Sequence, residues 1–230
     1  MHKLSLPLRQ GLDALELSLD EHQQNQLLSY VDLMGKWTRV YNLTAVRDPQ
    51  EMLTHHLLDS LSVVMPLRHQ LDSLGLDRLG KPKGDQGPSE LQGPFALLDV
   101  GSGAGLPGVV IAITCPDIRV TCLDAVAKKV AFIQQVAATL KLSNLNGLHA
   151  RIETIAQPYD IISSRAFSSL ADLVNGSHKA LAVGGVWMAM KGKKPEEELA
   201  ALPEVAKVFH VEQLKVPGLD AQRCLVWMRG

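Results

Sequence analysis

The sequence predicts an α/β protein in which a Rossmann-like, mostly parallel sheet ends in an antiparallel hairpin and a helical extension precedes it. Three observations predict this fold. Short apolar runs alternate with helical patterns between residues 95 and 191, which indicates strands joined by helical crossovers. The last two apolar runs, KVFHVEQLKV and RCLVWMR, are separated only by PGLDAQ, so they should pair as an antiparallel hairpin. Residues 8–66 instead repeat apolar residues at helical spacing.

The helical extension is expected to occupy residues 1–74 and to pack on the core. Within it, Asp48-Pro49-Gln50-Glu51 is a helix start signal, because Asp48 can accept hydrogen bonds from free amides and Pro49 loses none in the first turn. Glu51 would complete a capping box. Residues 75–94 are rich in glycine, proline and charge, which predicts a loop, and residues 95–230 form the core.

The core is expected to contain five strands before the hairpin. The runs FALLDV, VTCLDA, NGLHA, YDIISS and GGVWMAM each read as a strand. A helix should start near Pro107 and run through GVVIAITC, and an amphipathic helix should follow from Val126 to about Leu140. This alternation calls for a parallel sheet that is covered on both faces.

The composition of the chain limits the classes of function that the protein can have. The chain has 230 residues, 46% of them apolar, and a formal net charge of −1, so contact with nucleic acid must come from local basic patches. It lacks a membrane-length apolar window and the N-terminal pattern of a signal peptide, so we expect a cytoplasmic protein. Cys115, Cys122 and Cys224 lack metal-ligand spacing and should be buried thiols. No metal site is expected, because the adjacent His55 and His56 point to different sides of a helix.

The stretch DVGSGAGLPG, residues 99–108, follows the first core strand and admits two interpretations. Counted from Gly103 it satisfies GxGxxG, with Asp124 at a suitable distance to bind a ribose, which is typical of nicotinamide-dependent oxidoreductases. Counted from Asp99 it is DxGxGxG, the pattern of S-adenosylmethionine-dependent methyltransferases. The acid before the glycines and the reversed hairpin favour the second interpretation. An RNA-binding module that lacks catalysis is a third possibility.

The residue types of this loop suit a nucleoside ligand. Gly101, Gly103 and Gly105 can adopt positive φ and let a ligand approach the main chain, while amides at the following helix start can donate to a carboxylate. Asp124, at a strand end, can accept hydrogen bonds from ribose hydroxyls. The set of expected cofactor-binding residues in this region therefore comprises Asp99, Gly101, Gly103, Gly105, Leu106, which would form a wall, and Asp124.

Several longer segments carry a more specific resemblance. They are KWTRVYNLTAVRDPQEMLTHHLLDSLSV, DVGSGAGLPG, CLDAVAKKVAFIQQV, SRAF and MKGKKPEEEL. With them the chain resembles, over nearly its whole length, the bacterial small-subunit ribosomal RNA methyltransferase G family, also called glucose-inhibited division protein B. The resemblance implies transfer of a methyl group from S-adenosylmethionine to nitrogen 7 of one guanine in the decoding-region loop of 16S rRNA. It implies as partner 16S rRNA or the small ribosomal subunit particle, and we expect a monomer.

The family's site residues carry over onto matching positions. Gly101, Leu106, Ile152, Glu153 and Arg165 would then bind the cofactor, and Arg165 would also stand where donor and base meet. The chain departs from the family pattern in three places: KWT replaces KWN, His55 replaces the arginine of RHILDS, and DAVAKK replaces DSxGK. In the last of these, Ala125 follows Asp124 where the family pattern has serine, which weakens any role for a hydroxyl beside Asp124.

The implied chemistry requires no general base. Nitrogen 7 of guanine carries an in-plane lone pair and can attack the sulfonium methyl without losing a proton, so Arg165 should position rather than accept a proton. Asp59 falls where a helix turn could face the pocket, but its preferred interpretation is an exposed or capping carboxylate. Candidate RNA contacts are basic residues near predicted strand ends or in the helical part, namely Arg39, Arg47, Lys128, Lys129, Lys191, Lys193 and Lys194.

Overall fold

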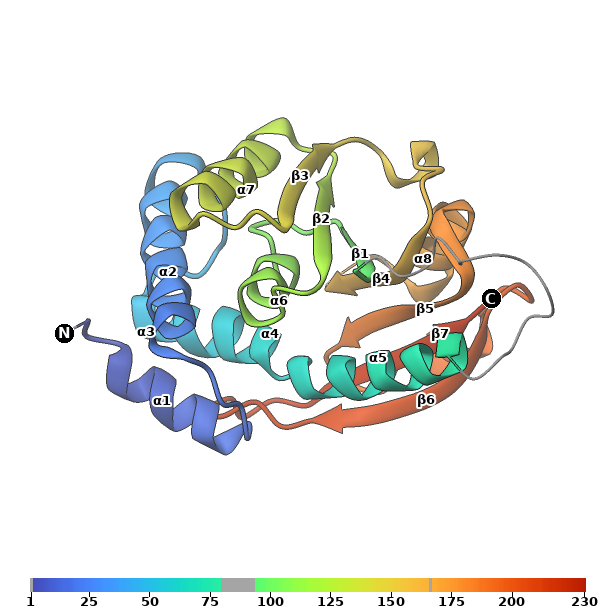
Figure 1. Cartoon of the computed structure of the whole chain (residues 1–230), viewed down its shortest axis with the longest axis horizontal. Coiled ribbons are helices and arrows are strands. Elements are labelled where there is room, and N and C mark those ends of the chain that lie inside the picture. Colours follow the sequence, from blue (N-terminus) through green and yellow to red (C-terminus); the bar gives the residue numbers. More distant parts are fainter. Residues whose placement is uncertain (1, 80–93, 166) are drawn as a thin grey trace.

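A seven-stranded sheet organises the molecule, with the strand order β3-β2-β1-β4-β5-β7-β6 (Figure 1). The computed structural model describes residues 2–79, 94–165 and 167–230. The strands are β1 (Ala96–Val100), β2 (Arg119–Asp124), β3 (Leu145–His149), β4 (Tyr159–Arg165), β5 (Leu181–Lys191), β6 (Lys207–Leu214) and β7 (Arg223–Arg229). Strands β1 to β5 pair in parallel, whereas β7 lies antiparallel between β5 and β6. The predicted parallel sheet with a reversed terminal hairpin is therefore confirmed.

Successive residues of the central strands enter two different cores. Leu97 of β1 belongs to the core on one face of the sheet, and its neighbour Leu98 belongs to the core on the other. Met188 and Ala189 of β5 divide in the same way. Side chains alternate across a strand, so a sheet covered on both faces needs continuous apolar runs. The three cysteines are buried free thiols, as predicted.

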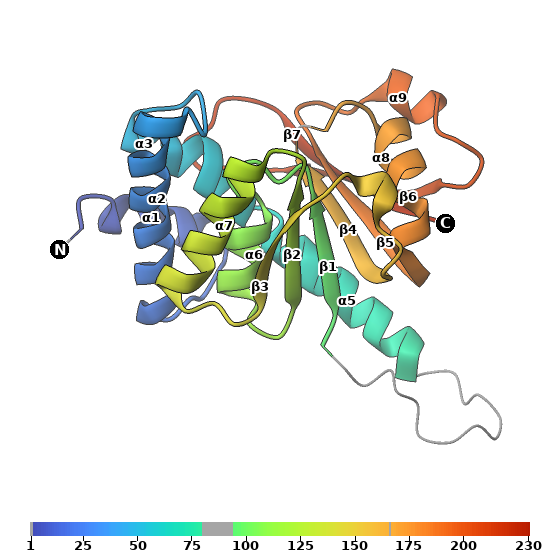
Figure 2. The same ribbon diagram turned by 90° about the horizontal axis from the view of Figure 1, so that it is seen from above.

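Helices cover both faces of the sheet (Figure 2). The helical elements before the sheet are α1 (Ser5–Ala14), α2 (Glu21–Tyr41), α3 (Pro49–Met52), the π-helix η1 (Leu53–Leu58), α4 (Asp59–Leu61) and α5 (Val64–Leu79). Those between strands are α6 (Gly108–Thr114), α7 (Ala127–Leu140), the 3₁₀ turn η2 (Ile152–Thr154), α8 (Leu170–Ser177), the 3₁₀ turn η3 (His178–Ala180) and α9 (Glu196–Ala200). Residues of α2, α5, α6 and α7 share one core, and those of α8 share the other. Among the helices of the described ranges, none is both long and apolar enough to cross a lipid bilayer.

The helical extension differs from its prediction in two details. Asp48 accepts from the amides of Gln50 and Glu51 at 2.8 and 3.0 Å, so the predicted start signal operates, although only this half of the capping interaction is formed. The helix that follows is not regular, because a π-helical turn interrupts it after Met52. The helix α5 extends to Leu79, so the loop begins later than residue 75, and residues 80–93 of the predicted loop lie outside the described residues.

Helix α2 is bonded directly to the core elements through three side chains. Gln23 donates to the carbonyl of Ile113 near the end of α6 at 2.9 Å, and Gln26 donates to the carbonyl of Leu140 at the end of α7 at 2.8 Å. Both bonds satisfy carbonyl groups that a helix end leaves without an intrahelical partner. Tyr30 is fully buried, and its hydroxyl donates to the carbonyl of Ala104, in the glycine loop after β1, at 2.6 Å.

We predict that Tyr30→Phe lowers the free energy of unfolding by about 1 to 3 kcal/mol, because it leaves the buried carbonyl of Ala104 without a donor. Urea denaturation measures this. Tyr41→Phe serves as the control, since the Tyr41 side chain is half exposed and the same substitution there should leave the midpoint unchanged. Equal midpoints for the two variants would contradict the role of Tyr30.

Candidate active site

The glycine loop after β1 adopts the backbone conformation that its sequence predicts. Gly101, Gly103 and Gly105 have φ values of +65°, +60° and +89°, in the left-handed region that side chains disfavour. A Cβ on Gly105 would also collide with the side chain of Val109, and a Cβ on Gly101 would lie 3.3 Å from the ring of Phe167. The loop therefore requires glycine both for its bend and for the close approach of its neighbours.

Asp99 lies beneath this loop and does not line either of the cavities described below. Its side chain is fully buried. One oxygen accepts from the amide of Gly108 at 2.9 Å, and the other accepts from the hydroxyl of Ser163 at 3.0 Å. The carboxyl group thereby connects β1 to the start of α6 and to β4. Its hydrogen bonds fix both ends of the glycine loop.

The start of α6 does not offer the amides that the sequence analysis assigned to a ligand carboxylate. The amide of Gly108 donates to Asp99, and that of Val109 donates to the carbonyl of Gly105 at 2.7 Å. Both donors are consumed within the protein, so the expectation of a carboxylate-binding helix start is wrong at these two positions.

Asp124 ends β2 and faces the glycine loop, as predicted. One carboxylate oxygen accepts from the amide of Gly103 at 3.0 Å, and the other accepts from the amide of Val126 at 2.9 Å. The ammonium of Lys129 lies 3.6 Å from the first of these oxygens. Asp124 is thus held in place by the main chain on both sides.

A cavity of about 400 Å³ opens beside Asp124, and we call it the loop cavity. Its lining residues are Val100, Gly101, Leu123, Asp124, Ala125, Lys129, Ala150, Arg151, Ile152, Glu153, Phe167 and Ser168. The lining combines the carboxylates of Asp124 and Glu153 and the cations of Lys129 and Arg151 with apolar side chains such as Ile152. Polar groups beside apolar surface suit a nucleoside, whose ribose is polar and whose base is flat and apolar. The volume lies within the range of small-molecule sites.

The loop cavity gathers some of the predicted cofactor residues and not others. Gly101, Asp124, Ile152 and Glu153 line it. Leu106 does not, because its side chain is buried in the core that the helical extension shares. Gly103 and Gly105 shape the loop without lining the cavity. Sequence reasoning missed Phe167, although it lies within the quoted SRAF segment.

A second cleft, of about 430 Å³, contains Arg165, and we call it the arginine cleft. Its lining residues are His55, His56, Asp59, Arg165, Met190, Lys191, Gly192 and Arg223. Asp59 is almost fully buried, so the preferred interpretation as an exposed carboxylate is wrong, and the alternative, that it faces a pocket, is confirmed. It accepts from Nη1 of Arg165 at 3.0 Å and from Nε of Arg223 at 2.8 Å.

His56 contributes a neutral imidazole to the arginine cleft. Burial, together with the nearby charge of Arg165, lowers its pKa below the usual value of 6.5. Its Nε2 lies 2.7 Å from the hydroxyl of Thr44. The positive charge in this cleft therefore comes from the arginines and Lys191.

Both cavities lie where parallel strands end. Asp124 and Arg165 are the last residues of β2 and β4, and Gly101 directly follows β1. The strand order reverses between β1 and β4, and ligands of open α/β sheets bind at such a switch point. Figure 2 shows β1 and β2 ending at the same edge of the sheet.

The predicted RNA-contacting residues are mostly engaged with neighbours within the chain. Lys191 pairs with Glu198 at 2.7 Å, Lys194 with Glu196 at 3.7 Å and Lys129 with Asp124. Arg39 donates to a carbonyl of its own helix and Arg47 donates to Asn42. Lys128 and Lys193 are exposed. A single basic surface formed by all seven residues is not shown.

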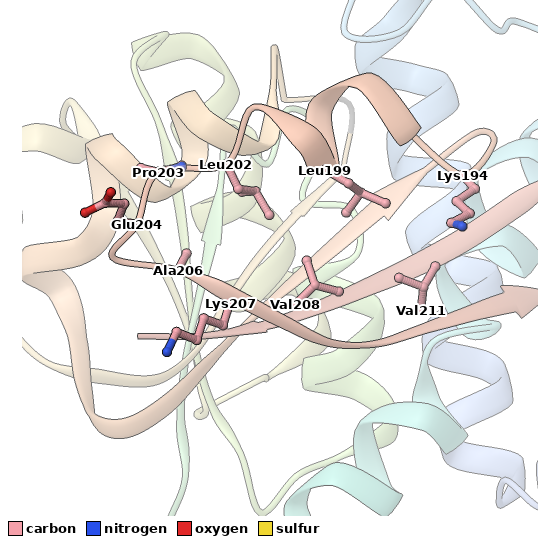
Figure 3. Close-up of a pocket in the computed structure, with 9 residues that line it drawn as sticks. All are labelled: Lys194, Leu199, Leu202, Pro203, Glu204, Ala206, Lys207, Val208 and Val211. Carbon is pink, nitrogen blue, oxygen red and sulfur yellow. The ribbon is translucent and has the colours of Figure 1, made fainter.

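A further pocket, of about 630 Å³, lies between α9 and β6 (Figure 3). Its lining is largely apolar and includes Leu199, Leu202 and Val208. Among the predicted site residues only Lys194 reaches it. This pocket therefore does not belong to the arrangement formed by the loop cavity and the arginine cleft.

The strand order, the antiparallel β7 and the glycine loop together define the fold of class I S-adenosylmethionine-dependent methyltransferases. The solved structure of TrmN from Thermus thermophilus has this fold in common with the chain, with a TM-score of 0.50 and 18% identity over 60% of this chain and 44% of that one.

The family follows from the sequence comparison. Residues 23–226 match the sequence model of a family described as "rRNA small subunit methyltransferase G". A protein of that name from Polaromonas sp. strain JS666 is 64% identical over 96% of this chain and 92% of its own length. A protein of the same name from Albidiferax ferrireducens is 61% identical over 100% of this chain and 98% of its own length. The chain belongs to the rRNA small subunit methyltransferase G family, and it is an S-adenosylmethionine-dependent methyltransferase.

The buried carboxyl of Asp99 makes stability depend on pH. Desolvation raises its pKa from 3.8 to about 7, against the opposing hydrogen bonds from Gly108 and Ser163. Since the unfolded chain releases this proton at a lower pH than the folded protein, the free energy of unfolding should fall as pH rises from about 4 to about 7.

We predict that Asp99→Asn removes this dependence. The amide oxygen can accept from Gly108 and the amide nitrogen can donate to Ser163, so the loop keeps its anchor. Between about pH 5 and 7.5 the free energy of unfolding of the native protein should fall by about 2 kcal/mol more than that of the variant. Urea denaturation at each pH measures this. Parallel curves for the two proteins would show that Asp99 is ionised throughout this range.

Proposed function

We propose that this enzyme transfers the methyl group of S-adenosylmethionine to nitrogen 7 of one guanine in the decoding-region loop of 16S rRNA. The partner is 16S rRNA or the small ribosomal subunit particle, and the enzyme acts as a monomer in the cytoplasm. One observation carries the proposal: the last residue of β4 and the residues just after it line two different cavities. Arg165 lines the arginine cleft, while Phe167 and Ser168 line the loop cavity, so a donor and an acceptor would meet at this segment.

The loop cavity supplies what a bound S-adenosylmethionine needs. Asp124 and Glu153 offer carboxylates to ribose hydroxyls, and Ile152 and Phe167 offer apolar surface to the adenine. Gly101, which carries no side chain, leaves the main chain open to the remainder of the molecule. The cofactor brings a methyl group on a positively charged sulfur. The protein has to hold it in place and exclude water.

The arginine cleft supplies a cationic site for a nucleotide. Guanine N7 attacks through its own lone pair, so the reaction needs no proton acceptor at the base. A guanidinium keeps its protons at any physiological pH, so Arg165 binds and orients the guanine or its phosphate. Catalysis then rests on the alignment of the donor sulfur, the methyl carbon and N7.

The residues expected to contact RNA now divide into three groups. Lys191 lines the arginine cleft itself, and Lys193 and Lys194 lie in the adjoining loop after β5. Arg39, Arg47 and Lys128 would bind more distant phosphates, whereas Lys129 lines the loop cavity beside Asp124. Because phosphate contacts release counterions, RNA binding should weaken as salt concentration rises.

We predict that Asp124→Ala weakens the binding of S-adenosylmethionine by about 1.5 to 3 kcal/mol, the range of hydrogen bonds to a charged group. Isothermal titration calorimetry measures this on the purified protein. Asp117→Ala, which removes an exposed carboxylate paired with Arg68, is the matched control and should retain native affinity. Native affinity in Asp124→Ala would remove this residue from the donor site.

The proposed reaction is tested on small ribosomal subunits from cells that lack the gene. Incubation with the native protein and S-adenosylmethionine should produce 7-methylguanosine at one position, located by primer extension after cleavage at the modified base. We predict that Arg165→Ala methylates about 10- to 100-fold more slowly and keeps the native circular dichroism spectrum.

Three results would overturn parts of this proposal. Full activity of Arg165→Ala would remove the arginine from the acceptor site. RNA binding without binding of S-adenosylmethionine would support a non-catalytic module. Binding of a nicotinamide dinucleotide in its place would support an oxidoreductase.

A further inference from the structure

Asp59 bridges two arginines that stand on opposite sides of β5. Arg165 ends β4 and Arg223 begins β7, and both strands pair with β5. Because β7 is antiparallel, its first residue lies at the edge where β4 ends. Each oxygen of Asp59 accepts from a different guanidinium, at 3.0 and 2.8 Å. One carboxylate thereby fixes the relative positions of two cations on separate strands.

The wide turn before Asp59 adds a second acceptor for Arg165. The segment Leu53–Leu58 is π-helical, and the amide of Asp59 donates to the carbonyl of Thr54, five residues earlier. The carbonyl of His55 in this turn accepts from the same Nη1 of Arg165 at 3.2 Å. Single π-helical turns inside helices occur frequently at functional sites. Here the turn supplies one acceptor, the carbonyl of His55, and the residue directly after it supplies the other, the carboxylate of Asp59.

The burial pattern places the anion behind the cations. The side chain of Asp59 is 4% exposed, whereas those of Arg165 and Arg223 are 21% and 25% exposed. All three line the arginine cleft. The bonds to Asp59 and His55 engage only Nη1 of Arg165 among the contacts of the described residues, and a guanidinium carries five N–H donors. The remaining donors of this residue are available to a substrate.

Energetics favour a positioning role over a purely stabilising one. A buried ion pair gains little net stability, because the cost of removing the charges from water offsets most of their attraction. The better-supported use of such a pair is to specify one arrangement of its members. A carboxylate shared by two partly exposed arginines at a candidate acceptor site fits that use.

We propose that Asp59 is a positioning residue for the methyl transfer: it aims Arg165 and Arg223 into the arginine cleft, where both bind the nucleotide that contains the target guanine. This inference rests on the proposed function. It also assigns to the acceptor site a residue, Arg223, that the sequence analysis did not select. Asp59 itself touches neither substrate nor cofactor.

The test compares Asp59→Asn with the native enzyme on small ribosomal subunits. We expect kcat to fall by about 10- to 100-fold, because Arg165 loses the partner that orients it. The KM for the RNA particle should stay within about twofold of native or decrease, because the variant removes a negative charge from a cationic cleft. A residue needed only for the fold would raise KM as well and lower the melting temperature.

A double-variant comparison shows whether Asp59 acts through Arg165. In an Arg165→Ala background, Asp59→Asn should cause less than about a twofold further loss of kcat, since effects of residues that act as a unit are not additive. A full additional loss in that background would overturn the proposal. Asp117→Asn breaks an exposed aspartate–arginine pair at Arg68 and should retain native kcat and KM.

Two further measurements cover the remaining outcomes. If Asp59→Asn does not fold, Asp59→Asn/Arg223→Gln removes one charge of each sign and should fold while kcat stays at least about 10-fold low. Hydrogen exchange at Nε of Arg223, followed by NMR, should accelerate at least about 10-fold in Asp59→Asn. Native exchange, or native kcat in a folded variant, would overturn the proposal.

A native protein that methylates no RNA would instead overturn the proposed function, and the exchange measurement would still decide whether Asp59 holds Arg223.

Discussion

The buried carboxyl group of Asp99 is the constraint on which the donor side of the structure depends. It joins the end of β1 to the first amide of α6 and to the hydroxyl of Ser163 in β4. The glycine loop spans the interval between Asp99 and α6, so its ends are fixed by one side chain. Asp124 then holds the middle of the loop through Gly103. Two acids on neighbouring strands therefore determine the shape of the loop, and only the second reaches the cavity.

The helical extension supports the same loop from outside. The hydroxyl of Tyr30 reaches the carbonyl of Ala104, and the glutamines of α2 reach the ends of α6 and α7. The extension also contains the π-helical turn that directly precedes Asp59. The residues before the sheet thus act on both cavities, at one through the loop backbone and at the other through a carboxylate.

The fold was largely predictable from the sequence, whereas the site was predictable only in part. Continuous apolar runs predicted the strands, and the short PGLDAQ connection predicted the antiparallel hairpin. Both signals can be read from neighbouring residues in the chain. The burial of Asp99 was not predictable, since the identity of an acid does not reveal whether its partners are a ligand or the main chain. The two arginine partners of Asp59 were not predictable, because both are more than 100 positions away in the chain. The π-helical turn was missed because regular helical spacing continues through it.

The position of β7 has a consequence for the order in which the chain folds. Strand β6 precedes β7 in the chain, yet β7 lies between β6 and β5. During synthesis β6 therefore has no neighbour in the sheet until β7 has emerged from the ribosome. Arg223 arrives with β7. The arginine cleft is therefore incomplete on a chain that lacks Arg223, even when the glycine loop has formed.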